Sequence, residues 1–190
     1  DEAKIGIYIC DVAGHGIAAS MMTMFIKQAM RSIKDEVLSP GLALEELHKR
    51  FSTLQLEADK YFTIFYGVYN KVTHRFTYSN AGHNCYPIKF NSEEIEPLKI
   101  KGYPITLLFE KVEYKEKEIK LDPGDKILLY TDGITEARDH NDKQFGIEGV
   151  LETVQKNPDN ILKEVEDKFI IHSWGEQDDD YALVLVEVVD

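Results

Sequence analysis

The sequence predicts a mixed α/β domain built on antiparallel sheets rather than on a doubly wound parallel sheet. Hydrophobic residues first recur at helical spacing, between residues 17 and 58. From residue 61 to about residue 101 the hydrophobic period falls to two, and short polar turns join the strand-like segments. A second pair of helical segments, between residues 144 and 172, precedes one last strand-like run. Paired helices around consecutive hairpin-linked strands favour layered antiparallel sheets.

The first three expected elements are a strand and two helices. Residues 4–10 form an apolar run typical of a buried strand. One helix follows Gly16, and the next spans about Gly41 to Ala58. For this methionine-rich pair, ordinary core packing is favoured over a partner-binding surface. The residues expected on the buried faces are Met21, Met22, Phe25, Ile26, Ala29, Met30 and Ile33 in the first helix, and Leu44, Leu47, Phe51, Leu54 and Ala58 in the second.

The later elements are delimited by turn residues. Hairpin connections are expected at 70–74 and 91–94, where Asn, Ser and charged residues interrupt alternating segments. The turn Asp122-Pro123-Gly124-Asp125 joins two further strands. These strands are expected at 112–121 and 126–131, followed by helices at 144–155 and 158–172, separated at Asn157-Pro158, and by a last strand at 181–189.

Length and composition indicate one globular domain, residues 1–190. The chain has 190 residues, of which 43% are hydrophobic and 29% charged, and no apolar run approaches the roughly 20 residues of a membrane span. A net charge of −12 argues against a nucleic-acid partner and suits cation binding. The two cysteines form no CxxC pair, which favours a reducing, cytoplasmic location. Since the chain begins at Asp1 without Met, we expect a fragment of a longer protein, whose upstream segment could anchor it to a membrane.

Three acidic motifs lie where strand-like runs meet turns. They are Asp11-Val12-Ala13-Gly14-His15-Gly16, Tyr130-Thr131-Asp132-Gly133 and Asp178-Asp179-Asp180. Each alone is equally explained by a turn or a solvated loop. Carboxylates brought together without a cation would repel one another, and Mg²⁺ or Mn²⁺ offsets that repulsion. The motifs together therefore predict a site for hard divalent cations rather than for zinc, since no Cys/His cluster accompanies the acids.

The chemistry open to such a site is hydrolysis. Two hard cations held by carboxylates activate a water and neutralise a phosphoryl group. The sequence contains no Gly-x-Ser-x-Gly elbow, no Ser-His-Asp order and no phosphate-binding Gly-x-x-x-x-Gly-Lys-[Ser/Thr] loop. Metal-assisted hydrolysis is therefore favoured over a covalent enzyme intermediate.

Four motifs in order resemble those of the PPM-type (protein phosphatase 2C-like) serine/threonine phosphatases, in the SpoIIE and RsbU subgroup. They are the Asp11–Gly16 motif, Asn80-Ala81-Gly82-His83-Asn84, Leu129–Ala137 around Asp132-Gly133, and Asp179-Asp180-x-x-Leu183. The resemblance covers nearly the whole chain. It implies a four-layer α-β-β-α sandwich of two antiparallel sheets flanked by helices.

The resemblance also implies a site with two Mn²⁺ or Mg²⁺ ions. The metal ligands would be the side chains of Asp11, Asp132 and Asp179 and the backbone carbonyl of Val12. A metal-bound water would be the nucleophile, so no side chain is assigned as catalytic. Residues that could support the site are Gly14, His15, Gly16, Gly133, Asp178 and Asp180, the last two being alternatives to Asp179.

The implied substrate is phosphoserine or phosphothreonine in a regulatory protein, a STAS-type anti-sigma-factor antagonist. An upstream sensor domain and a homodimer are further implied partners. The family normally has an upstream strand with another acidic ligand, so an N-terminal strand is expected to be missing before Asp1. Ala182 replaces a Thr common in the family.

Alternative interpretations remain open. The chain could be a catalytically inactive regulatory module of the same fold, or, with less support, a metal-dependent nuclease or nucleotide hydrolase. His15 and His83 could act as general acids, although a role in orienting loops is favoured. Asn80 and Asn84 are expected to form turns.

Overall fold

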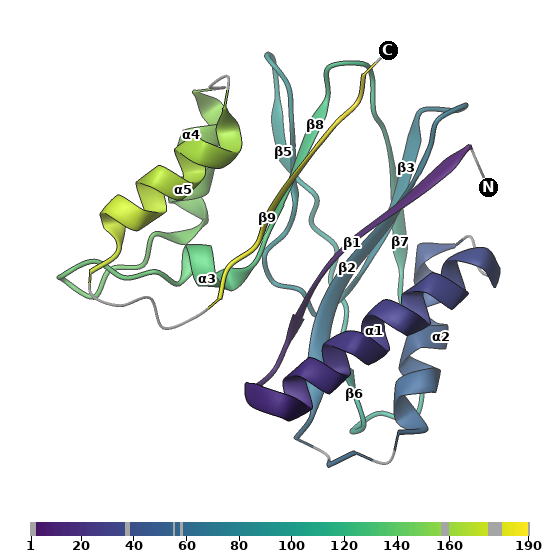
Figure 1. The fold of residues 1–190 in the computed structure, drawn as a ribbon. Helices are drawn as coiled ribbons and strands as arrows, with labels where there is room; N and C mark the ends of the chain where they lie inside the picture. The colour runs from purple at the N-terminus through teal and green to yellow at the C-terminus, as the bar shows by residue number, and fades with distance from the viewer. Residues whose placement is uncertain are drawn as a thin grey trace. The chain divides into compact units, whose positions relative to one another are not determined.

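A computed structural model divides the chain into two units. The structure describes residues 3–36, 39–54, 56–57, 59–156, 160–174 and 180–189. Unit 1 comprises Asp1–His83 and Ile100–Leu121, and unit 2 comprises Asn84–Lys99 and Asp122–Asp190. Each unit contains one antiparallel sheet with helices, which confirms the predicted fold class (Figure 1).

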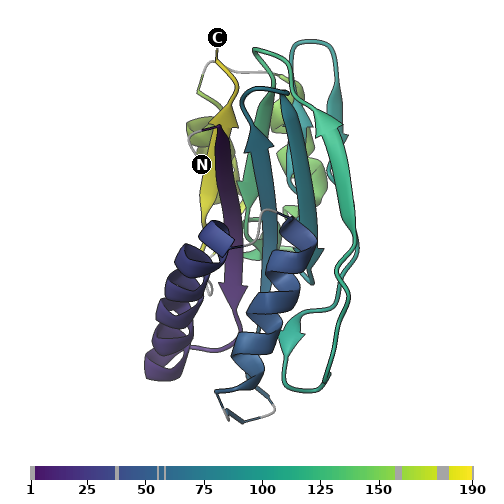
Figure 2. The same ribbon diagram turned by 90° about the vertical axis from the view of Figure 1, so that its right-hand side faces the viewer.

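The sheet of unit 1 has the strand order β1-β2-β3-β7, and a short β6 also pairs with β2. All of these pairings are antiparallel. The helices α1 and α2 lie side by side along this sheet (Figure 2). The bounds are β1 Lys4–Val12, α1 Gly16–Glu36, α2 Pro40–Ser52, β2 Tyr61–Asn70, β3 Arg75–Ala81, β6 Ile105–Thr106 and β7 Glu116–Lys120.

The core of unit 1 lies between the sheet and the two helices. Alternate residues of β2, such as Phe62 and Ile64, are fully buried against α1 and α2, as the period of two predicts. Phe51 of α2 stacks edge-on against Phe62 with ring centroids 5.1 Å apart, and its centroid lies 6.0 Å from that of Phe25 in α1. This aromatic cluster joins both helices to the central strand, and the next residue along β2, Thr63, projects from the opposite face of the sheet.

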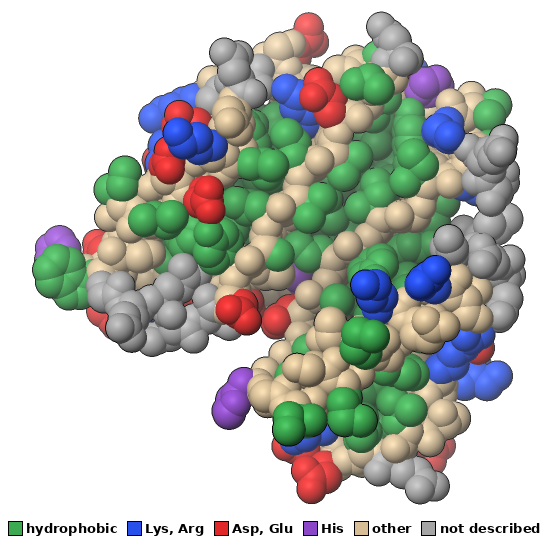
Figure 3. All heavy atoms as spheres, in the orientation of Figure 1, with side chains coloured by type: hydrophobic (Ala, Val, Ile, Leu, Met, Phe, Trp, Pro, Cys, Tyr) green, Lys and Arg blue, Asp and Glu red, His purple; other side chains and the backbone are tan. Residues whose placement is uncertain are grey.

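Helix α1 differs from the prediction at its N-terminal half. Met22, Ile26, Ala29, Met30 and Ile33 are buried as expected, but Met21 is 69% exposed. Met21 lies on the outer side of the helix, where Ile17 and Met24 are also exposed. Figure 3 shows hydrophobic side chains on this outer surface of α1. Adjacent residues of a helix point in different directions, so Met21 and Met22 do not both face the core. Met22 is the one that is buried.

Helix α2 is shorter than the sequence predicts. Its start is fixed by Ser39, whose hydroxyl accepts a hydrogen bond from the amide of Leu42, and by Pro40 in the first turn. It ends at Ser52 instead of Ala58, and Leu54 is 38% exposed. The Thr53 hydroxyl donates to the carbonyl of Arg50 at 2.7 Å, a local bond that satisfies the helix end. Ala58 lies outside the described residues.

The sheet of unit 2 has the order β5-β4-β8-β9, again with antiparallel pairings. Among the residues that the structure describes in unit 2, three helices accompany this sheet, and their apolar residues form one core with it. The shortest of them, α3, is an element that the sequence analysis did not predict. The bounds are β4 Ile88–Phe90, β5 Ile95–Pro97, β8 Lys126–Tyr130, α3 Asp132–Thr135, α4 Gly146–Gln155, α5 Ile161–His172 and β9 Leu183–Glu187.

Several predicted bounds are too wide. The strand expected at 112–121 begins at Glu116, because the ladder between β3 and β7 ends at the pair Ser79–Glu116. The helix expected from 144 begins at Gly146, since Gln144 forms a β-bridge with Arg138. Asn160 caps α5 through its side chain, and Asn157-Pro158 lies outside the described residues. Within the described part of the chain, no helix is both long and apolar enough to cross a membrane.

Candidate functional site

Asp11 lies at the end of β1, where the strand leaves the sheet of unit 1. It is half-buried and pairs in register with Thr63 of β2. The following loop contains Gly14 and Gly16 at φ values of 96° and 79°, a left-handed backbone that favours glycine. His15 between them is exposed. A turn with left-handed glycines thus directly follows Asp11, as the sequence predicts.

The backbone at Val12 has a carbonyl that the sheet does not use. The amide of Ala13 donates to the carbonyl of Tyr61 at 3.1 Å, which makes Ala13 and Tyr61 a hydrogen-bonded pair. Hydrogen-bonded and non-hydrogen-bonded pairs alternate in an antiparallel ladder, so the pair Val12–Phe62 is of the second kind. The Val12 carbonyl consequently points away from β2, while its side chain packs against the core of unit 1.

Asp132 also follows a strand, in unit 2: it is the first residue of α3, just after β8. The preceding Thr131 is buried and makes two bonds to Ala182: its amide donates to the carbonyl at 3.2 Å, and its hydroxyl accepts from the amide at 2.9 Å. A Cβ atom added at Gly133 would lie 2.4 Å from the carbonyl oxygen of Asp180. Unit 2 therefore brings Asp132 and Gly133 together with Asp180, while Asp178 and Asp179 lie outside the described residues.

Residues Asn80–His83 of the Asn80–Asn84 motif form a closed corner in unit 1. The Asn80 side chain accepts from the amide of His83 at 2.8 Å and donates to the carbonyls of His83 at 2.9 Å and Ile100 at 2.8 Å. Gly82 has a φ of 77°, and a Cβ atom on Gly102 would lie 1.8 Å from the Asn80 carbonyl oxygen. Asn80 and His83 are both 3% exposed. These contacts support a loop-forming role for Asn80 and an orienting role for His83.

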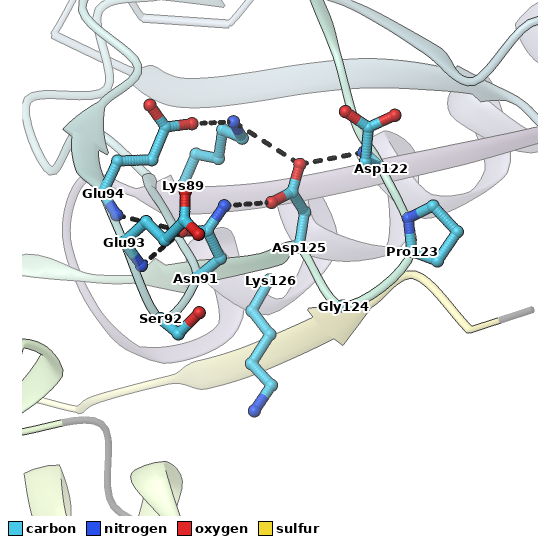
Figure 4. Close-up of a pocket in the computed structure, with 10 residues that line it drawn as sticks. All are labelled: Lys89, Asn91, Ser92, Glu93, Glu94, Asp122, Pro123, Gly124, Asp125 and Lys126. Atoms are coloured by element: carbon cyan, nitrogen blue, oxygen red, sulfur yellow. Dashed lines mark hydrogen bonds and ion pairs between the residues drawn. The ribbon is translucent and has the colours of Figure 1, made fainter.

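A polar pocket of about 740 Å³ lies in unit 2 between the turns 91–94 and 122–125 (Figure 4). Lys89 Nζ forms ion pairs with Glu94 and, at 3.4 Å, with Asp125, whose other oxygen accepts from Asn91 at 2.7 Å. Burial disfavours the charged lysine, but the two carboxylates outweigh it and raise the pKa of Lys89. Because these groups satisfy one another, the network links the hairpin turn 91–94 to the turn 122–125 and is a structural feature.

A family model described as Stage II sporulation protein E (SpoIIE) matches residues 1–189. The chain belongs to the SpoIIE family. It is 31% identical over 195 residues to Phosphoserine phosphatase RsbU of Bacillus subtilis (98% of this chain, 56% of that protein). Identity to Phosphoserine phosphatase RsbP of the same organism is 26% over 196 residues (99% and 47%). This SpoIIE-family chain therefore spans about half the length of these curated relatives.

Solved structures show that this SpoIIE-family chain has a PP2C-like fold. The SiaA-PP2C domain of Pseudomonas aeruginosa matches with a TM-score of 0.81 at 18% identity (99% of this chain, 81% of that chain). RsbX in complex with magnesium matches with a TM-score of 0.70 at 19% identity (97% and 81%). The catalytic domain of the phosphatase PstP in complex with 2 manganese ions matches with a TM-score of 0.67 at 14% identity (97% and 88%).

The donors assigned in this SpoIIE-family chain suit a hard cation. They are carboxylate and carbonyl oxygens, which Mg²⁺ and Mn²⁺ prefer. Among the residues that the structure describes, no group of three His, Cys, Asp or Glu side chains could by itself hold a metal ion. Asp179, which is also assigned as a ligand, lies outside the described residues. The assignment of Asp11, Val12, Asp132 and Asp179 thus stays a prediction.

Sequence reasoning assigned no role to Thr63 or Thr131. Thr131 bonds to a residue 51 positions away in the chain, and Thr63 contacts His83, 20 positions away. The only available signal was position: Thr131 immediately precedes Asp132, and the alternation of β2 sets Thr63 on the sheet face opposite Phe62.

Cys10 precedes Asp11 and is expected to be unreactive. Burial, assisted by the Asp11 charge, raises the pKa of its thiol to about 11. The thiol is therefore protonated at neutral pH, unlike the nucleophile of a cysteine phosphatase. At pH 8 we expect iodoacetamide to label Cys10 at least about tenfold more slowly than free cysteine, with a rate that climbs steadily up to about pH 11. Mass spectrometry of the Cys10 peptide measures this, and a rate that levels off near pH 8 would contradict it.

Proposed function

We propose that this chain is the catalytic domain of a metal-dependent protein phosphatase that hydrolyses phosphoserine or phosphothreonine in a regulatory protein. The observation that carries the proposal is the pair of carboxylates, Asp11 and Asp132, each at a strand end with a glycine-containing turn. Membership of the SpoIIE family supports it, since the relatives RsbU and RsbP are named phosphoserine phosphatases.

The proposal assigns two Mn²⁺ or Mg²⁺ ions to the side chains of Asp11, Asp132 and Asp179 and to the carbonyl of Val12. Asp178 and Asp180 are the neighbouring candidates. When bound, the ions would supply positive charge that polarises the phosphoryl group and lowers the pKa of the attacking water. RsbX in complex with magnesium and PstP in complex with 2 manganese ions have the same fold, which supports this choice of metal.

The chain's own residues hold and orient these ligands. The bonds between Thr131 and Ala182 keep the Asp132 turn beside Asp180, so Ala182 contributes through its backbone even without the threonine hydroxyl common in the family. Gly133 allows the close approach of Asp180. Gly14 and Gly16 leave exposed backbone beside Asp11, and exposed His15 between them is available to a substrate.

The substrate and partners follow from the same proposal. We assign a phosphorylated STAS-type anti-sigma-factor antagonist as substrate, as the family resemblance implies. The names of RsbU and RsbP support the phosphoserine part of this assignment. An upstream regulatory domain and a second copy of the chain are the other predicted partners. The exposed Ile17, Met21 and Met24 of α1 are apolar surface that such a contact would cover. The upstream acidic strand and the cytoplasmic location stay predictions.

The proposal is tested by assaying the full-length protein for phosphate release from a phosphoserine-containing STAS-type protein. We expect turnover with Mn²⁺ or Mg²⁺ and none in a chelator, because the carboxylates need the cations to bind the phosphoryl group. Calorimetry should show Mn²⁺ binding under the same conditions. Metal binding without turnover on phosphoserine or phosphothreonine proteins would contradict the enzyme assignment and favour the regulatory-module alternative.

A further inference from the structure

The corner built by Asn80 and Gly82 holds one side chain, His83, in a fixed place in unit 1. The Asn80 amide binds both the amide and the carbonyl of His83, so the backbone at His83 cannot rotate without breaking buried hydrogen bonds. A buried Asn whose side chain makes three hydrogen bonds rigidifies the backbone around it. The imidazole of His83 is therefore carried on a rigid corner.

The imidazole of His83 contacts Thr63, which is the cross-strand neighbour of Asp11. Its Nδ1 atom lies 3.3 Å from the Thr63 hydroxyl oxygen. Thr63 is directly opposite Asp11 in the antiparallel ladder of β1 and β2. Directly opposite residues point to the same face and have Cβ atoms about 4.5–5.5 Å apart. Thr63 therefore contacts a buried histidine through its hydroxyl and faces Asp11, the residue assigned to the metal, across the ladder.

We propose that His83 is a positioning residue for Asp11 and acts through Thr63. In this arrangement His83 donates its Nδ1 hydrogen to the Thr63 oxygen, so the single hydroxyl hydrogen of Thr63 remains available for the Asp11 carboxylate. A hydrogen bond from Thr63 fixes which carboxylate oxygen faces a cation and keeps the other oxygen satisfied. The proposal rests on the proposed function, since it presumes that Asp11 binds the metal.

The opposite proton arrangement would serve Asp11 less well. If Thr63 donated its only hydrogen to His83, its oxygen would present lone pairs to a carboxylate that also carries only lone pairs. The two oxygens would repel, and Asp11 would lose a fixed orientation. The imidazole tautomer with the hydrogen on Nδ1 is therefore the one that gives the Asn80–His83 corner a role at the metal site.

The test is Mn²⁺ affinity, measured by calorimetry on the full-length protein. Thr63→Val removes the hydroxyl at nearly constant shape and is expected to weaken Mn²⁺ binding by about 10–100-fold, the usual effect of losing a group that orients a metal ligand. Thr63→Ser keeps the hydroxyl and should remain within about threefold of the wild type. His83→Ala should match Thr63→Val, whereas His83→Asn, which keeps a donor near the Nδ1 position, should recover most of the affinity.

The double variant His83→Ala/Thr63→Val distinguishes an effect of His83 that passes through Thr63 from two independent effects on Mn²⁺ affinity. If the two residues act through one another, the double variant binds Mn²⁺ no more weakly than the weaker-binding single variant. His48 is the matched control, because it is another buried histidine of unit 1, and its Nε2 lies 3.1 Å from the Thr106 carbonyl oxygen. His48→Ala should lower thermal stability and leave Mn²⁺ affinity unchanged.

The outcomes separate this inference from the proposed function. Unchanged Mn²⁺ affinity in Thr63→Val, or losses that multiply in the double variant, overturns the positioning role while phosphatase activity can persist. Mn²⁺ binding with the expected pattern but without hydrolysis of phosphoserine or phosphothreonine overturns the enzyme assignment alone. A wild-type protein that binds no Mn²⁺ overturns both.

Discussion

Asp132→Asn is expected to reduce metal-dependent phosphatase activity by more than about 100-fold. The substitution keeps the shape of the side chain but removes the charge that would hold the cation. Loss of a group that merely orients a ligand costs about 10–100-fold in affinity or activity, and loss of the ligand itself should cost more. The fold should be retained, because Asp132 is only half-buried and its backbone accepts the amide of Glu136 in either variant.

Phosphate release from a phosphoserine protein with Mn²⁺ measures this effect, and calorimetry follows metal binding in parallel. Asp142→Asn is the matched control in unit 2. Asp142 has a side chain 84% exposed and a φ of 63°, a conformation that Asn also tolerates. Its surface ion pair with Arg138 should contribute less than about 1 kcal/mol to stability. We expect wild-type activity in the control. Equal activity in both variants would show that Asp132 is not a metal ligand.

The parts of the fold that sequence predicted well are those with local signals. Asn70 and Asn91 were expected in hairpin turns, and each accepts hydrogen bonds from amides two and three residues further along. The end of β1 at the Asp11 motif was also readable, because an apolar run stops where glycines begin. Such signals depend on neighbouring residues alone.

The parts that sequence could not predict depend on distant partners. The Asp132 turn is held by Ala182, and Asn80 is held by Ile100 and packed against Gly102. These contacts exist only after the strands have paired, so they leave no periodic pattern in the chain. The same holds for β7, whose start at Glu116 is set by the end of its ladder with β3. Local patterns thus located the acidic motifs, and tertiary contacts hold the turns beside them.

Phe51→Ala is expected to destabilise unit 1 by about 3–5 kcal/mol, the range for truncating a fully buried aromatic side chain. Phe51 is fully buried, and its ring meets Phe62 of β2 edge-on at 5.1 Å and Phe25 of α1 at 6.0 Å. Because whole domains are stable by only about 5–15 kcal/mol, a loss of this size removes a large fraction of the total. Urea unfolding measures it as a lower midpoint with an unchanged slope.

Leu54→Ala is the matched control for Phe51→Ala. The hydrophobic period of the helix expected over about Gly41 to Ala58 sets both residues on one buried stripe, so the sequence pattern alone predicts comparable losses. The structure ends the helix at Ser52 and leaves Leu54 38% exposed, so its truncation should cost about 0.5 kcal/mol or little more. Similar losses in the two variants would mean that the helix continues past Ser52. A large loss in Phe51→Ala alone would show that α2 is anchored to the sheet carrying Asp11 by the aromatic cluster.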